Sequence, residues 1–181
     1  FLQNQMICDL NEGYAIYRPR YILPDYNVYI KKGCEFLELP APKNLDEALD
    51  GLLILYSHVP SITTFPVYIG RLDVLLDPFI IDEEQDYIKI KRFLNHVDKT
   101  VPDSFCHANI GPYDTKAGRL ILKAVIELEA PTPNMTIRYD KSKTSREFAE
   151  LAAKACLLVS KPSFANDTYY ISDLGEQYGI A

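Results

Sequence analysis

The sequence predicts an α/β fold in which strands and amphipathic helices alternate. Residues 104–110 and 134–139 alternate apolar and polar side chains, as strands do. Apolar stripes at helical spacing follow them: Ala117, Leu120, Ile121, Ala124, Val125 and Leu128, then Phe148, Leu151, Ala152, Ala155 and Leu158. Strand, helix, strand, helix in this order favours a parallel sheet with right-handed crossovers.

Helix start signals precede two of the predicted helices. Asn44 and Glu47 have the spacing of a capping box, and apolar residues then recur at helical spacing until Pro60, where we expect the helix to stop. Thr144 and Glu147 have the same spacing before the last helix. The sequence therefore predicts both helix N-termini.

The remaining segments give weaker patterns. Residues 66–70 are predicted to form a short strand, followed by a helix from Arg71, and a further helix should follow the acidic turn 82–84. Residues 1–12 favour a helix, 13–24 an extended connection, and 27–39 a short helix or strand. The α/β class rests mainly on the later segments.

Composition narrows the classes of function. The 181-residue chain is 48% hydrophobic and carries a formal net charge of −6, which disfavours a nucleic-acid partner. No apolar run approaches the roughly 20 residues that span a bilayer, so we expect no membrane association. Four cysteines without a regular spacing favour a reduced, cytoplasmic setting.

The sequence has no recognisable catalytic or metal-binding motif. The three histidines are scattered, and neither a glycine-rich phosphate loop nor clustered cysteines occur. Cys106 and Cys156 fall among apolar residues and are predicted to pack as small buried side chains. We therefore predict no catalytic residue, no metal site and no cofactor bound by this chain.

One predicted strand has a polar face that needs an explanation. Asn134, Thr136 and Arg138 alternate with apolar residues, whereas a strand buried in a doubly wound sheet is apolar on both faces. The strand either lies at an edge or in a sheet with one solvated face, or it lines the polar interior of a barrel. In the barrel alternative, Arg138 is suited to bind a carboxylate or another anion.

Several stretches, taken in order, resemble the glycyl radical enzyme superfamily of pyruvate formate-lyase and the diol dehydratases. They are VYIGRLD at 67–73, SFCHANIGPYDT at 104–115, APTPNMTIRY at 130–139, KPSFAND at 161–167 and YGIA at 178–181. RPRYILPDY at 18–26 and YSHVPS at 56–61 are similar in order and spacing to the YjjI-type branch. The resemblance covers nearly the whole chain.

The resemblance implies half of a ten-stranded α/β barrel. In the family, a separate iron–sulfur, S-adenosylmethionine-dependent activating enzyme creates a glycyl radical. The radical passes to a cysteine in the barrel, and the resulting thiyl radical abstracts a hydrogen atom from a small-molecule substrate. No residue of this chain matches the radical cysteine or glycine. The matching positions Asn134, Arg138, Arg71 and Asn109 are candidate substrate-pocket residues.

We therefore interpret residues 1–181 as a single internal fragment of a cytoplasmic, anaerobic glycyl radical enzyme, inactive by itself. Its partners would be the activating enzyme and the substrate, and a homo-oligomer is also compatible. The alternatives are a binding module that recognises an anion through Arg138 and a purely structural module. Both would derive from the same fold.

Overall fold

The structure, a computed structural model, describes residues 24–63, 67–100 and 106–169. The helices are α1 (Tyr26–Lys32), α2 (Leu45–Thr63), α3 (Leu72–Leu76), α4 (Glu83–Thr100), α5 (Lys116–Glu127) and α6 (Arg146–Val159), with 3-10 turns η1 (Glu35–Leu37) and η2 (Asp77–Phe79). The strands are β1 (Val67–Arg71), β2 (Cys106–Ile110), β3 (Asn134–Tyr139) and β4 (Ser163–Asn166). The predicted α/β class is confirmed.

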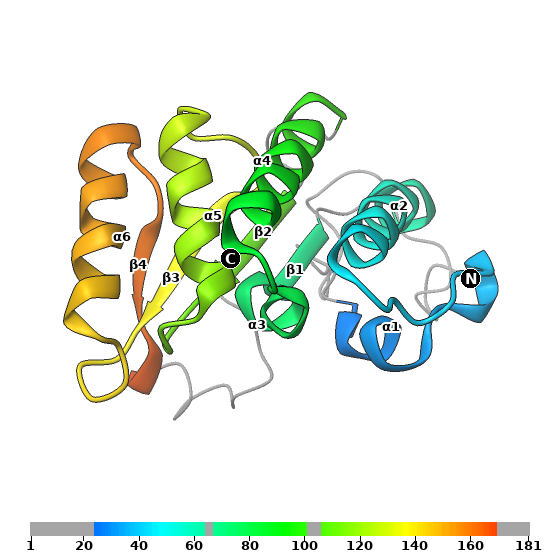
Figure 1. Cartoon of the computed structure of the whole chain (residues 1–181), viewed down its shortest axis with the longest axis horizontal. Helices are drawn as coiled ribbons and strands as arrows, with labels where there is room; N and C mark the ends of the chain where they lie inside the picture. Colours follow the sequence, from blue (N-terminus) through cyan, green and yellow to red (C-terminus); the bar gives the residue numbers. More distant parts are fainter. Residues whose placement is uncertain (1–23, 64–66, 101–105, 170–181) are drawn as a thin grey trace, which may run out of the picture.

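The four strands form one parallel sheet in the order β1-β2-β3-β4 (Figure 1). Each connection between neighbouring strands passes through at least one helix, as parallel pairing requires. The register places His107 opposite Asn134 and Arg138 opposite Ala165, with an irregularity in β1 between Tyr68 and Arg71. Because all three pairings are parallel, the four strand carboxyl ends lie at the same edge.

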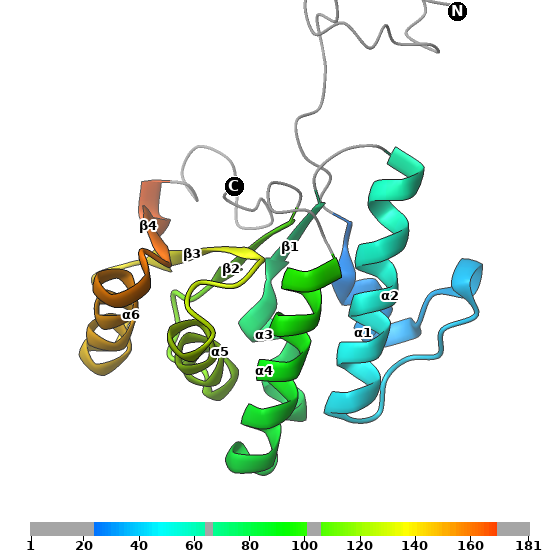
Figure 2. The same cartoon turned by 90° about the horizontal axis from the view of Figure 1, so that it is seen from above.

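Helices α4, α5 and α6 lie side by side on one face of the sheet (Figure 2). The apolar residues of the strands pack against them, among them Val67, Ile69, Cys106, Ala108, Ile110, Met135 and Ile137. No described helix covers the opposite face of β2 and β3. The core therefore lies between the sheet and these helices and continues into the buried faces of α1, α2 and α3.

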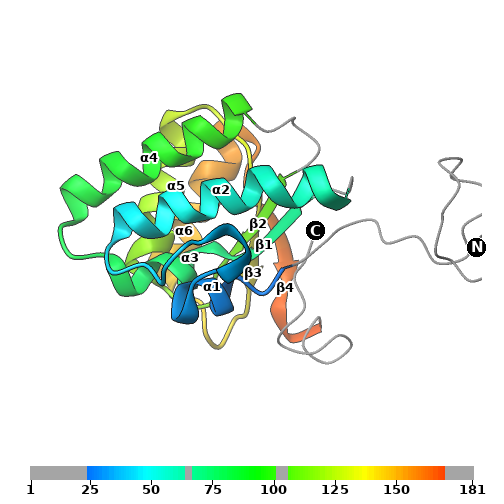
Figure 3. The same ribbon diagram turned by 90° about the vertical axis from the view of Figure 1, so that its right-hand side faces the viewer.

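Helix α2 runs alongside α4 (Figure 3), and the two are joined by the Lys89 Nζ–Asp46 Oδ2 ion pair at 2.9 Å. The predicted start of α2 is confirmed, because Asn44 Oδ1 accepts the Glu47 backbone N–H at 2.9 Å. The predicted stop at Pro60 is wrong, since α2 continues to Thr63. A proline in the last turn removes only one backbone hydrogen bond, so three more residues can remain helical.

The start of α6 differs by one residue from the prediction. Ser145 is the N-cap, and its side chain accepts the Phe148 backbone N–H at 3.1 Å. The Thr144 hydroxyl instead accepts the Asp140 backbone N–H at 3.1 Å and so closes the preceding turn.

The apolar stripe predicted for α6 is buried only in part. Leu158 is 59% exposed, because no described element covers that side of the outermost helix. Cys156 is half-buried rather than buried.

The two most strongly patterned strands were predicted well. β3 has the predicted bounds, and the Cys106, Ala108 and Ile110 face of β2 is fully buried, as expected. Residues 27–39 contain most of α1 and the turn η1. The expectations for residues 1–23 lie outside the described residues.

Candidate functional site

The sheet face opposite α4–α6 carries polar side chains across its three longest strands. They are Tyr68 of β1, His107 and Asn109 of β2, and Asn134, Thr136 and Arg138 of β3. The parallel register aligns them in rows, and Asn109 Nδ2 donates to the Thr136 carbonyl oxygen at 3.4 Å. The sheet therefore has one apolar face and one polar face.

Arg138 lies near the carboxyl end of β3 in a buried ion pair. Its Nε donates to Asp167 Oδ1, and the side chains of Arg138 and Asp167 are 3% and 1% exposed. Asp167 Oδ2 lies 3.6 Å from Lys143 Nζ, and the same amine lies 3.4 Å from Asp140 Oδ2. The four charges alternate in sign, so the cluster is electrically balanced.

Asp140 organises the loop between β3 and α6. Hydrogen bonds from the Ser142 hydroxyl and backbone N–H lower the pKa of Asp140 to about 2. The Thr168 hydroxyl donates to the other Asp140 oxygen at 3.2 Å.

An open hollow of about 540 Å³ lies beside this loop, with Tyr139 and Phe164 on its wall. Its polar groups at Asp140 already bond to one another, so the hollow offers little to a ligand.

A second corner lies at the carboxyl end of β1. The Arg71 guanidinium carbon lies 6.0 Å from the ring centre of Tyr113, which belongs to the loop between β2 and α5. Arg71 Nε is buried and has no hydrogen-bond acceptor among the described residues. Register places Arg71 opposite Asn109. This arginine therefore stacks on an aromatic ring without an anionic partner at hydrogen-bond distance.

Asp73 holds the loop that carries Tyr113. Its fully buried Oδ2 accepts the Gly111 backbone N–H at 2.9 Å and the Thr115 hydroxyl at 3.3 Å. Burial raises the pKa of Asp73 to about 6, although these hydrogen bonds and the nearby Arg71 charge act in the opposite direction. Asp73 is thus a buried carboxyl group that titrates near neutral pH.

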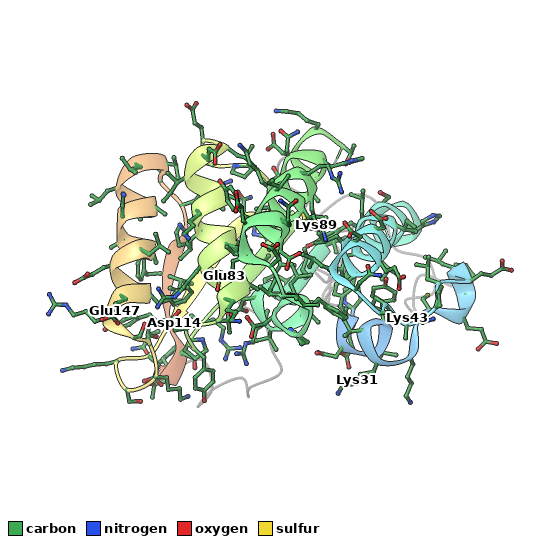
Figure 4. The ribbon with its side chains drawn as sticks, in the orientation of Figure 1. Lys31, Lys43, Glu83, Lys89, Asp114 and Glu147 are labelled. Atoms are coloured by element: carbon green, nitrogen blue, oxygen red, sulfur yellow. The ribbon has the colours of Figure 1, made fainter. Side chains whose placement is uncertain are left out.

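The helices begin at the same end of the molecule where the strands finish. Glu83, Asp114 and Glu147 mark the starts of α4, α5 and α6 (Figure 4). Arg119 forms an ion pair with Asp114, and the Ser145 hydroxyl donates to the same carboxylate. These exposed and half-buried contacts join neighbouring helix starts and frame the carboxyl edge of the sheet.

The four predicted pocket residues do not converge on one point. Asn109, Asn134 and Arg138 share the polar face, but Asn134 opens β3 and lies four residues, roughly 13 Å of strand, before Arg138. Arg71 lies two strands from Arg138, at the same edge of the sheet. The structure therefore gives two separate arginine corners at one edge of the sheet.

Sequence reasoning missed the acidic and aromatic residues that lie beside these arginines. Asp73 follows Arg71 by two residues, and Asp167 ends the KPSFAND stretch, so both were in segments already singled out. Tyr113 lies in the loop after β2, and no pattern in the sequence linked it to Arg71. Only the parallel pairing of β1 with β2 brings the two together.

The cysteines of the described segments show no feature of a reactive thiol. Cys106 is fully buried on the helix-covered face, and burial raises its pKa to about 12. Such a side chain stays protonated at neutral pH and is a poor nucleophile. Cys34 and Cys156 are half-buried and free. The prediction that Cys106 packs as a small buried residue is confirmed.

Comparison with known proteins identifies the family. The family model described as "Glycyl radical enzyme YjjI-like" matches residues 1–181. The chain belongs to the YjjI-like glycyl radical enzyme family. It is 92% identical over all 181 residues to an uncharacterized protein of Haemophilus influenzae, and 47% identical over 167 residues to the uncharacterized protein YjjI of Escherichia coli.

This member of the YjjI-like family corresponds to about a third of each relative. The matched segments cover 35% of the Haemophilus protein and 32% of the Escherichia coli protein. A fragment of a larger protein fits these proportions. Among the described helices, none is long and apolar enough to cross a membrane.

Proposed function

We propose that this chain forms part of the barrel wall of a glycyl radical enzyme and is inactive by itself. In this proposal the sheet β1–β4 belongs to one half of the ten-stranded barrel, with α4–α6 on the outside. The whole protein would use a glycyl radical and a cysteine thiyl radical to transform a small molecule. The radical would be installed by a separate iron–sulfur, S-adenosylmethionine-dependent enzyme in the cytoplasm of cells living without oxygen.

The observation that carries this proposal is the two-faced parallel sheet in a member of this family. The described helices pack on the apolar face, while Asn109, Thr136 and Arg138 occupy the other face of the central strands. Polar groups on an inward face can orient a substrate, and a closed wall keeps water and oxidants from a radical. In a free-standing sheet the same polar face would neither orient an enclosed substrate nor keep water and oxidants away from a radical.

The rival binding module has less support. In that alternative Arg138 binds the anion. The Arg138 side chain is buried, however, and Asp167 offsets its charge. Breaking that pair to admit a ligand would leave the buried Asp167 with only the half-buried Lys143 amine, 3.6 Å from its Oδ2, which is costly. We therefore favour a supporting role for Arg138 in the barrel wall.

The experiment is anaerobic activation of the full-length protein, followed by electron paramagnetic resonance. We expect an organic radical signal whose hyperfine pattern changes when the protein is labelled with deuterated glycine. The 181-residue chain, treated identically, should give no signal. Absence of a radical from the full-length protein, with an activating enzyme that still cleaves S-adenosylmethionine, would refute the proposal.

A further inference from the structure

The two arginines at the carboxyl edge of the sheet differ in how their charge is used. Arg138 is buried against Asp167, with Lys143 close by. Arg71 stacks on Tyr113, and its buried Nε has no hydrogen-bond acceptor within the described segments. Arg71 therefore keeps an unused N–H donor at Nε, whereas Arg138 Nε already donates to Asp167.

A buried donor without an acceptor is uncommon in native proteins and calls for an explanation. A guanidinium has N–H donors and no acceptor of its own, so the buried Arg71 Nε–H needs an acceptor from another group. Stacking on Tyr113 stabilises the cation but satisfies none of those N–H groups. An acceptor from outside the described residues would satisfy them.

Asp73 is the acidic residue nearest in sequence, and its hydrogen bonds lie elsewhere. Its Oδ2 accepts from Gly111 and Thr115, which fixes the loop of Tyr113, and its Oδ1 has no hydrogen-bond donor in the described segments. Its charge acts on Arg71 through space, without an ion pair within 4 Å. The loop is thus anchored while the arginine stays available.

We propose that Arg71, backed by Tyr113, is an oxyanion subsite that binds a carboxylate or phosphate group of the substrate. The planar guanidinium can donate two parallel hydrogen bonds to such a group. The subsite lies at the carboxyl ends of parallel strands, the usual place for ligands in α/β sheets. This inference rests on the proposed function and names its substrate class: a small anionic molecule.

An oxyanion could come from two sources, a free small molecule or a carboxylate side chain of the remaining two-thirds of the protein. The test therefore uses the full-length protein, not activated, with the arginine reagent phenylglyoxal and mass-spectrometric mapping of the modified peptides. Acetate, malonate and inorganic phosphate serve as probes. Arg92, an exposed arginine of α4, is the internal control.

We expect phenylglyoxal to modify Arg71 and at least one probe anion to slow this reaction, while modification of Arg92 stays unchanged. Arg71→Met should weaken binding of that anion at least about tenfold, because a charge-assisted hydrogen bond is lost. Arg92→Met should not affect it. Arg71→Lys, which keeps the charge, should lie between the wild-type protein and Arg71→Met.

Two results would overturn the subsite. Modification of Arg71 without protection by any probe anion would mean that no small oxyanion binds there. An unreactive Arg71 in the full-length protein, with unaltered anion affinity in Arg71→Met, would assign the partner to the rest of the chain. Neither result depends on radical formation, so failure of the radical assay remains a separate outcome.

Discussion

At the scale of single residues, the buried charges at the carboxyl edge of the sheet have unequal costs. Arg138→Met should destabilise the region around β3 and β4 by about 2 to 4 kcal/mol, because it removes the buried hydrogen-bonded partner of Asp167 and leaves only Lys143, 3.6 Å away. Amide hydrogen exchange of these strands measures the change in local opening free energy.

Arg146→Met is the matched control. Arg146 also pairs through Nε with a carboxylate, Glu150 Oε1 at 2.7 Å, but the two side chains are 87% and 63% exposed. Its loss should cost much less than the loss of Arg138, because exposed ion pairs contribute little to stability. Equal losses in the two variants would contradict the view that Arg138 supports the fold through a desolvated pair.

Asp73 predicts a dependence of stability on pH. Its pKa is raised from 3.8 to about 6, so the folded protein binds a proton more tightly than the unfolded chain between these values. The contribution of Asp73 to the free energy of unfolding therefore falls as pH rises from about 4 to 6, by on the order of 2 to 3 kcal/mol.

Asp73→Asn should remove this contribution while keeping an oxygen to accept from Gly111 and Thr115. The measurement is urea unfolding of both proteins across this pH range, taken as a difference so that other carboxyl groups cancel. A difference that stays constant with pH would show that Asp73 does not titrate in this window.

At the scale of elements, α5 and α6 pack closely because a glycine lies where their surfaces meet. A Cβ on Gly118 would lie 2.8 Å from Thr115 Oγ1 and 3.0 Å from Phe148 Cζ. The Gly118 N–H also donates to that Thr115 hydroxyl, which caps α5. Any side chain here would disturb both the cap and the helix contact.

Gly118→Ala should therefore destabilise the protein by about 1 to 2 kcal/mol, although alanine ordinarily stabilises a helix relative to glycine. Phe148→Leu shortens the opposing ring and should recover part of this loss in the double variant. Urea unfolding of the two single variants and the double variant gives the coupling energy. Strict additivity would argue against the close contact.

The sequence predicted those elements whose pattern reflects burial on one side. β3 alternates over six residues, and α5 keeps its apolar stripe through three turns, so both were found. β4 was missed as a strand because it has only four residues and Phe164 on it is 48% exposed, which leaves no alternation to read. The two arginine corners depend on contacts between distant segments, such as Arg71 with Tyr113, which no local pattern encodes.

At the scale of the whole molecule, the barrel proposal makes the polar face of the sheet an enclosed surface. Thr136 lies half-buried on that face, in the middle of β3. In a closed barrel a cysteine at this position would meet small solutes but not large ones. On an open sheet it would meet both.

Thr136→Cys in the full-length protein should react with small methyl methanethiosulfonate but not with a maleimide carrying a long polyethylene glycol chain. Ala153→Cys, exposed on α6, should react with both reagents, and native Cys106 with neither, because it is buried and its pKa is raised to about 12. Mass spectrometry of the labelled peptides separates the three sites.

Rapid reaction of Thr136→Cys with the large reagent would mean that the polar face is open. No reaction with either reagent would mean that this face is packed against protein. Only size-selective labelling agrees with a wall that surrounds a cavity.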